Sequence, residues 1–153
     1  AMRPHHPEYS YIDLPGSNVD ATLQYLLLGW PIVDPYERYR FVQETGNDRI
    51  VRLTEGYFLT TDAMKEGSPF QILQRGEKPE LPPTLIVQGT ADTNLPVAVT
   101  ERFVLAYREA GGDIELELFQ DMPHLFANTP GSESDQAIWL MKKFAAKCLS
   151  HGC

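Results

Sequence analysis

From residue 81 onward the sequence alternates between strand and helix patterns, and this order constrains the fold more than any other feature of the chain. An apolar run at 84–88 indicates a buried strand, and apolar residues spaced three and four apart indicate a helix that begins at Pro96. Alternation with glutamates at 114–118 indicates an edge strand, and a last helical stripe begins at Ser132. This order predicts an α/β fold whose parallel strands are joined by right-handed crossovers.

The first half of the chain supplies one more strand pattern and a long insertion. Residues 21–30 form a nearly continuous apolar run, which is typical of a strand covered on both faces. Residues 31–81 instead carry aromatic residues separated by charges. Short helical patterns occur there at 36–44, 50–57 and 62–66, and Ser68-Pro69 ends the last of them. We therefore expect a helical insertion between the first two strands.

Composition narrows the possible functions. The chain has 153 residues, with 13 Lys+Arg and 21 Asp+Glu, so its formal net charge is −8. An acidic chain of this length suits one globular domain and disfavours nucleic-acid binding, which requires Lys and Arg to displace counterions from phosphates. No apolar run reaches the roughly 18–20 residues that a membrane span needs. We expect neither a nucleic-acid partner nor a membrane span.

The cysteines and the first histidines give two smaller expectations. Cys148 and Cys153 are too near the end of the chain to close a useful loop, so we interpret them as free thiols, with Cys148 packed on a helix face. Free thiols favour a reducing compartment, and the expected location is cytoplasmic. His5-His6 with Glu8 lacks the spacing of a metal site, so no metal is expected.

Two titratable residues fall where ligands bind in open parallel sheets, beyond the carboxyl ends of the strands. Asp92 follows the buried strand and His124 follows the edge strand. A carboxylate that accepts a proton from one imidazole nitrogen orients the ring, and the other nitrogen can then act as a base. The alternative is that Asp92 only caps its own turn and His124 is a surface histidine.

The sequence around these residues resembles a known family. Gly89-Thr90-Ala91-Asp92 after one apolar strand and Met122-Pro123-His124 after the next are similar to the C-terminal half of an α/β-hydrolase, closest to its esterase, lipase and carbohydrate-esterase-like members. The resemblance covers essentially the whole chain. It implies a single partial domain, 1–153, with a three-layer αβα fold, mostly parallel strands six to eight and a helical cap at about 31–81.

The resemblance also implies a role for each residue. In this family the order along the chain is nucleophile, acid, base, so Asp92 matches the acid and His124 the base of a Ser-Asp-His triad that needs no cofactor. The family often has Gly where Leu125 stands. Trp30 and its neighbours are candidates for the wall of the substrate pocket. The full set of expected pocket residues is Trp30, Pro31, Tyr36, Leu125 and Phe126. The alternative for the cap aromatics Tyr36, Tyr39, Tyr57 and Phe58 is a small satellite core.

The nucleophile elbow of the family, Gly-x-Ser-x-Gly, does not occur in the sequence. Ser17 and Ser68 each follow a glycine, but neither lies between a strand and a helix. Ala1–Pro4 is typical of the end of a helix, so we expect the serine upstream of residue 1 and no activity from this chain alone. The exposed edge of the sixth strand would then bind the missing N-terminal half or a second copy of the chain.

Three functions are consistent with these features. The first is a serine hydrolase of small-molecule carboxylic esters, to which this chain contributes acid and base. The second is the C-terminal half of a serine peptidase of the prolyl-oligopeptidase type, which is similar in this half. The third is a non-catalytic α/β-hydrolase-like binding module that has no nucleophile.

Overall fold

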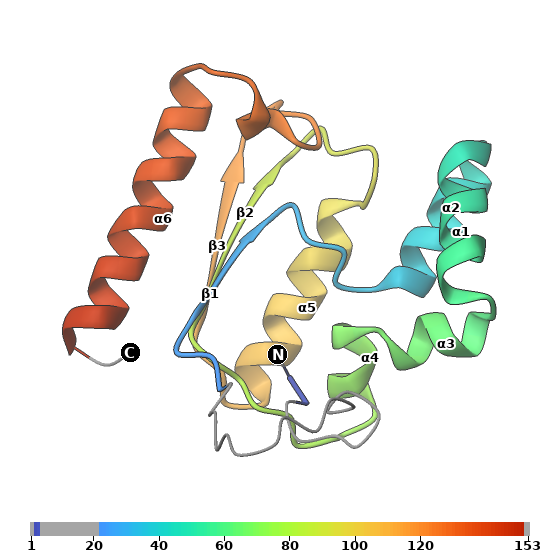
Figure 1. The fold of residues 1–153 in the computed structure, drawn as a ribbon, viewed down its shortest axis with the longest axis horizontal. Helices are drawn as coiled ribbons and strands as arrows, with labels where there is room; N and C mark the ends of the chain where they lie inside the picture. Colours follow the sequence, from blue (N-terminus) through green and yellow to red (C-terminus); the bar gives the residue numbers. More distant parts are fainter. Residues whose placement is uncertain (1, 4–21, 152–153) are drawn as a thin grey trace, which may run out of the picture.

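A three-stranded parallel sheet lies at the centre of the molecule (Figure 1). The computed structural model describes residues 2–3 and 22–151. The strands lie in the order β1-β2-β3, with Leu26 opposite Thr84 and Thr84 opposite Ile114. Their bounds are β1 Leu26–Gly29, β2 Thr84–Gly89 and β3 Ile114–Phe119. The expected parallel sheet, with the 114–118 strand at one edge, is confirmed.

One helix covers each face of this sheet. In Figure 1 helix α5 (Val97–Glu109) lies on one side and helix α6 (Ser132–His151) on the other. Alternate residues of β2 point to opposite faces, so Ile86 packs in the cluster under α5, and Leu85 and Val87 pack in the cluster under α6. The expected three-layer αβα arrangement is therefore confirmed.

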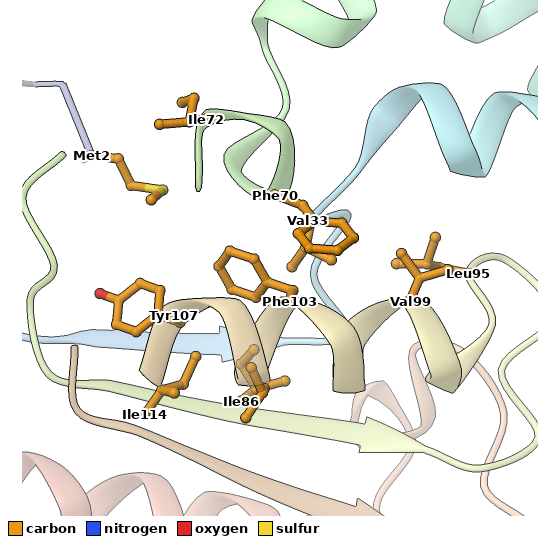
Figure 2. Close-up of a cluster of buried hydrophobic side chains, with 11 residues drawn as sticks. Met2, Val33, Phe70, Ile72, Ile86, Leu95, Val99, Phe103, Tyr107 and Ile114 are labelled. Carbon is orange, nitrogen blue, oxygen red and sulfur yellow. The ribbon is translucent and has the colours of Figure 1, made fainter. Parts of the chain in front are cut away.

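The cluster under α5 connects the sheet to the insertion (Figure 2). Phe103 lies at its centre, edge-on to Phe70 at 6.4 Å and to Tyr107 at 5.6 Å between ring centroids. Such T-shaped pairs add stabilisation beyond the area they bury. Because Phe70 comes from the insertion and Phe103 from α5, the insertion is packed against the sheet layer at this end.

The insertion contains four helices, each begun by a polar cap. Side chains of Asp34, Asn47, Thr60 and Ser68 accept hydrogen bonds from backbone amides of the first turns. This is the usual way of satisfying amides that have no partner inside a helix. The helices are α1 Pro35–Glu44, α2 Asp48–Phe58, α3 Thr61–Glu66 and α4 Pro69–Gln74.

Helix α4 was not expected from the sequence. Ser68-Pro69 does end the preceding helical pattern, but it also starts a new helix, because proline is tolerated in a first turn. The Ser68 hydroxyl accepts from the Gln71 amide and donates to the Val33 carbonyl. That second bond attaches the start of α4 to the chain that leaves β1.

Several sequence expectations are wrong in detail. β1 is shorter than 21–30, and its four residues are only partly buried, because its outer edge has no neighbouring strand within the described residues. Pro96 is the cap of α5 rather than its first residue. Met2 and Arg3 are not helical; the Met2 carbonyl accepts from the Glu80 amide and its side chain joins the core.

The free-thiol interpretation is also wrong for Cys148. Its sulfur is disulfide-bonded, and no described cysteine is a free thiol. Cys148 does lie on the buried face of α6, as expected. Cys153, like His5, His6, Glu8 and Ser17, lies outside the described residues. The argument from free thiols to a reducing compartment therefore fails.

Candidate active site

Asp92 and His124 meet across neighbouring loops. Asp92 lies in the turn after β2 and His124 in the loop after β3, and His124 Nδ1 is 2.9 Å from Asp92 Oδ2. The Asp92 side chain is 1% exposed and the His124 side chain 19% exposed. The carboxylate is thus shielded from water, and the imidazole is partly accessible.

The second carboxylate oxygen of Asp92 is bound by its own turn. Oδ1 accepts hydrogen bonds from the backbone amides of Asn94, at 2.7 Å, and Leu95, at 3.2 Å. Asp92 therefore caps its own turn through Oδ1 and contacts the imidazole through Oδ2. Because these amides fix the orientation of the carboxylate, Oδ2 is held toward His124.

The two loops are locked together by backbone contacts. The Ala91 amide donates to the Met122 carbonyl at 3.0 Å, and the Asp121 amide donates to Thr90 Oγ1 at 2.7 Å. A Cβ atom at Gly89 would lie 2.0 Å from the Met122 carbonyl oxygen, so only glycine permits this approach. The spacing between acid and imidazole thus depends on the backbone of both turns.

Asn94 contacts the other nitrogen of the imidazole, and sequence reasoning missed it. Its Nδ2 is 3.0 Å from His124 Nε2. If Nδ1 donates its proton to Asp92, Nε2 has a free lone pair, and the Asn94 amide is a donor that fits it. The Asn94 Oδ1 atom is buried and has no hydrogen-bond partner among the described residues. The only sequence signal was an amide two residues after the candidate acid.

The ring of one expected pocket residue, Trp30, lies near the imidazole. Its ring is edge-on to His124 at 6.3 Å and to Phe126 at 5.6 Å between centroids. Trp30 has a φ of 41° and Leu125 a φ of 64°, values that L-residues rarely adopt. Leu125 therefore takes the left-handed conformation, which favours glycine, and its side chain is exposed.

The remaining expected pocket residues differ in their surroundings. Phe126 is 7% exposed and belongs to the core cluster under α6. Tyr36 lies in the first turn of α1 with the Lys65 ammonium 4.7 Å above its ring, and none of its described contacts is with the Asp92–His124 pair. Pro31 is partly buried in the segment that follows β1.

The cap aromatics do not form a satellite core as a group. Tyr57 is 80% exposed, whereas the buried apolar residues of α1 and α3 are Val42 and Met64. Tyr39 uses its hydroxyl to bind Glu55 on α2 at 2.7 Å. Of these four aromatic residues only Tyr57 is exposed, and the other three are partly buried.

Three further features of the described chain bear on function. Residues 2–3 and 22–151 contain no cluster of three His, Cys, Asp or Glu side chains that could hold a metal ion. Within the same residues, every helix is too short or too polar to traverse a bilayer. Ser68, one of the serines that follow a glycine, is fully buried as a helix cap.

Comparison with known proteins identifies the family. The model of the prolyl oligopeptidase family matches residues 43–152, which include both Asp92 and His124. The chain belongs to the prolyl oligopeptidase family. No curated protein has a sequence significantly similar to this family member.

Solved structures similar to this prolyl oligopeptidase family member include an esterase of the planctomycete Thermogutta terrifontis. Its native form matches with a TM-score of 0.62 and 18% identity, over 93% of this chain and 50% of the esterase. Its propionate-bound form matches with a TM-score of 0.60 and 20% identity, over 89% and 47%. The butyrate-bound form matches with a TM-score of 0.60 and 20% identity, over 85% and 45%.

These matches confirm the fold and show how much of the matched esterases the chain covers. The chain has the fold of the C-terminal part of an α/β-hydrolase, as its parallel sheet and flanking helices also indicate. It spans about half the length of the solved esterases that it matches.

Proposed function

We propose that the chain supplies the acid and the base of a serine hydrolase that cleaves carboxylic esters of small molecules. The observation that supports this best is the 2.9 Å contact between His124 Nδ1 and Asp92 Oδ2, beyond the carboxyl ends of two adjacent parallel strands. Membership of the prolyl oligopeptidase family supports a serine hydrolase in general. Similarity of fold to an esterase favours esters.

In this mechanism His124 moves a proton in each half of the reaction. Its Nε2 accepts the hydroxyl proton of a serine as the serine oxygen attacks the ester carbonyl, and the imidazolium then donates that proton to the leaving alkoxide. The acyl group stays on the serine. Water then gives a proton to Nε2 and attacks the acyl group, and the proton returns to the serine oxygen. Asp92 keeps Nδ1 protonated and the ring oriented throughout.

The serine would come from polypeptide outside residues 1–153, since the sequence has no Gly-x-Ser-x-Gly elbow. We propose that the N-terminal half of the fold provides it, and that its hydroxyl displaces the Asn94 amide from His124 Nε2. Residues 1–153 alone would then hydrolyse no ester above background. An acylation burst from p-nitrophenyl butyrate with the 153-residue chain alone would contradict this.

A specific observation favours a second candidate function, peptide hydrolysis, because the family is named for oligopeptidases. The esterase structures instead hold propionate or butyrate, which favours short acyl esters as substrates. Hydrolysis of p-nitrophenyl butyrate and of an aminoacyl p-nitroanilide by the chain joined to its nucleophile-bearing half separates the two. We expect turnover of the ester and little of the anilide.

Two variants test the roles of the proposed acid and base. We expect Asp92→Asn to lower kcat by roughly 10³–10⁴-fold and His124→Ala to lower it at least as far. Asp121→Asn is the matched control, because this neighbouring carboxylate binds only Gln120 in the described structure and asparagine tolerates its left-handed backbone. If no elbow is encoded upstream and a fluorophosphonate labels no assembled form, the binding-module alternative replaces the enzyme.

A further inference from the structure

A small cavity lies between the first two helices of the insertion. Its volume is about 330 Å³, and it lies between the segment that leaves β1 and the facing sides of α1 and α2. Cavities of this size are at the lower end of those that bind small molecules. The lining residues are Ile32, Pro35, Arg38, Leu53, Thr54, Tyr57 and Phe58.

Arg38 is the single charged residue in this lining. Its Nε atom is buried and has no hydrogen-bond partner among the described residues. Burial also lowers the pKa of Arg38 below the usual range, since no carboxylate offsets the loss of solvation. An uncompensated, partly buried guanidinium is unfavourable, so this is a place where an anion would be stabilised.

Arg38 differs from four other arginines of the described chain, which bind carboxylates. The sequence has 21 Asp+Glu, and other arginines use them: Arg40 binds Glu44, Arg75 binds Glu77 and Arg102 binds Glu37. Arg40 is only two residues away on the same helix. Other arginines of the described chain also lack a carboxylate partner, but among these only Arg38 has a buried Nε with no hydrogen-bond partner.

The rest of the lining indicates that the remainder of the ligand would be apolar. Leu53, Tyr57 and Phe58 offer apolar and aromatic surface, and Leu53 and Tyr57 are exposed, so the cavity opens to solvent. The Thr54 hydroxyl already donates to the Ile50 carbonyl at 2.8 Å. A ligand in this cavity would thus contact one guanidinium group and mostly apolar side chains.

We propose that this cavity binds a small amphiphilic carboxylic acid, with its carboxylate on the Arg38 guanidinium and its apolar body against Leu53 and Phe58. A planar guanidinium with free N–H groups matches a carboxylate in geometry and charge. The proposal is independent of the proposed hydrolase function, because it concerns binding to the insertion and not the Asp92–His124 pair.

Calorimetric titration of the 153-residue chain with a matched pair of ligands tests the proposal. Phenylacetate carries the carboxylate, and phenylacetamide has nearly the same shape without the charge. We expect phenylacetate to bind saturably and at least about tenfold more tightly, because only it forms charge-assisted hydrogen bonds. Inorganic phosphate at the same ionic strength should bind more weakly than phenylacetate, because it has no apolar body.

Variants of two arginines on α1 locate the site. Arg38→Gln should weaken phenylacetate binding about tenfold or more, and Arg38→Lys should weaken it less. Arg40→Gln removes the same charge from the same helix and should change the affinity less than about twofold, since Arg40 is exposed and paired. Circular dichroism should show Arg38→Gln folded, because the side chain has no described partner to lose.

Each of the following results would overturn the proposal: equal affinity for acid and amide, equal affinity for phosphate and phenylacetate, or no saturable binding. The same holds if Arg38→Gln and Arg40→Gln weaken binding alike. An unfolded Arg38→Gln variant would also overturn it, because the guanidinium would then have a structural partner. None of these readouts depends on hydrolysis, so they leave the proposed function untouched.

Discussion

The two oxygens of Asp92 have different partners, and this division decides what a single substitution would do. In Asp92→Asn the side-chain carbonyl would stay with the backbone amides of Asn94 and Leu95, because an NH₂ group cannot accept their hydrogen bonds. The NH₂ group would then face His124 Nδ1 and donate to it. The imidazole proton would move to Nε2, where the lone pair of the base is needed.

We therefore expect Asp92→Asn to change the tautomer of His124 without moving its ring. Ring ¹⁵N chemical shifts of the 153-residue chain, recorded where the imidazole is neutral, measure this directly. The unsubstituted chain should give the Nδ1–H form and Asp92→Asn the Nε2–H form. Asn94→Ala should keep the Nδ1–H form, since it removes only the contact at Nε2. The same tautomer in all three proteins would contradict this account of Asp92.

Gly89 is the other residue on which the site depends. Gly89→Ala should destabilise the chain by about 3 kcal/mol or more, because its Cβ would lie 2.0 Å from a backbone carbonyl that no side-chain rotation can move. Gly56→Ala is the matched control, since it lies within α2 with nothing within 4 Å of the added atom. The control should stabilise by about 0.5–1 kcal/mol. Urea unfolding compares them, and equal effects would contradict the close approach.

At the scale of elements, Tyr107 connects α5 to the chain that enters β2. Its hydroxyl donates to the Pro82 carbonyl at 2.7 Å, and burial raises the pKa of Tyr107 above its usual value of 10.0. Above pH 10 the unfolded chain therefore loses this proton before the folded chain does. Unfolding then releases a proton, so this group makes the protein less stable as the pH rises.

Tyr107→Phe removes both the hydrogen bond and this alkaline sensitivity. At pH 7 the variant should be about 1 kcal/mol less stable, since the Pro82 carbonyl retains its bond from Thr84. The difference in the free energy of unfolding should shrink between pH 9 and pH 11, because only the unsubstituted chain is destabilised at Tyr107. Urea unfolding at several pH values measures the difference, and a constant or growing gap would contradict the buried hydroxyl.

The helices and strands also show which features of the fold can be predicted from the sequence and which cannot. The order of β2, α5, β3 and α6 follows from local periodicity, and the positions of Asp92 and His124 follow from that order. The contact of Asn94 with His124 does not, because it depends on how two turns pack. The sequence did not predict helix α4, because Ser68-Pro69 ends one helical pattern and also begins another. The Ser68–Val33 hydrogen bond, which holds the start of α4, joins residues far apart in the sequence and cannot be predicted from local periodicity.

At the scale of the whole molecule, the two edges of the sheet differ. β3 carries Glu115 and Glu117, and Lys147 of α6 contacts Glu115 at 3.1 Å, so this edge is charged. The sequence of β1 is Leu-Leu-Leu-Gly, so this strand has no charged side chain. Charges on an edge strand oppose further pairing, whereas an uncharged edge permits it. We propose the β1 edge as the side on which the rest of the hydrolase fold, or a second copy, adds.

The direction of the β1 amides makes this proposal testable. The Leu26 amide donates to the Pro83 carbonyl, and the Trp30 amide donates to the Val87 carbonyl. Because every second amide of a parallel strand faces the same neighbour, the Leu28 amide also points toward β2. The Gly29 amide then points to the open edge. A proline is tolerated where the lost N–H faces away from the sheet, and it blocks pairing there.

We expect the 153-residue chain to self-associate as its concentration rises, and Gly29→Pro to suppress this association while the fold is retained. An added Cβ at Gly29 meets only the Met141 methyl group, at 3.9 Å, so the site has room. Leu28→Pro is the matched control, because it removes an amide that faces β2 and should unfold the sheet. Sedimentation velocity and circular dichroism distinguish the outcomes. If the Gly29→Pro chain is folded and associates like the unsubstituted chain, the interface does not lie at the β1 edge.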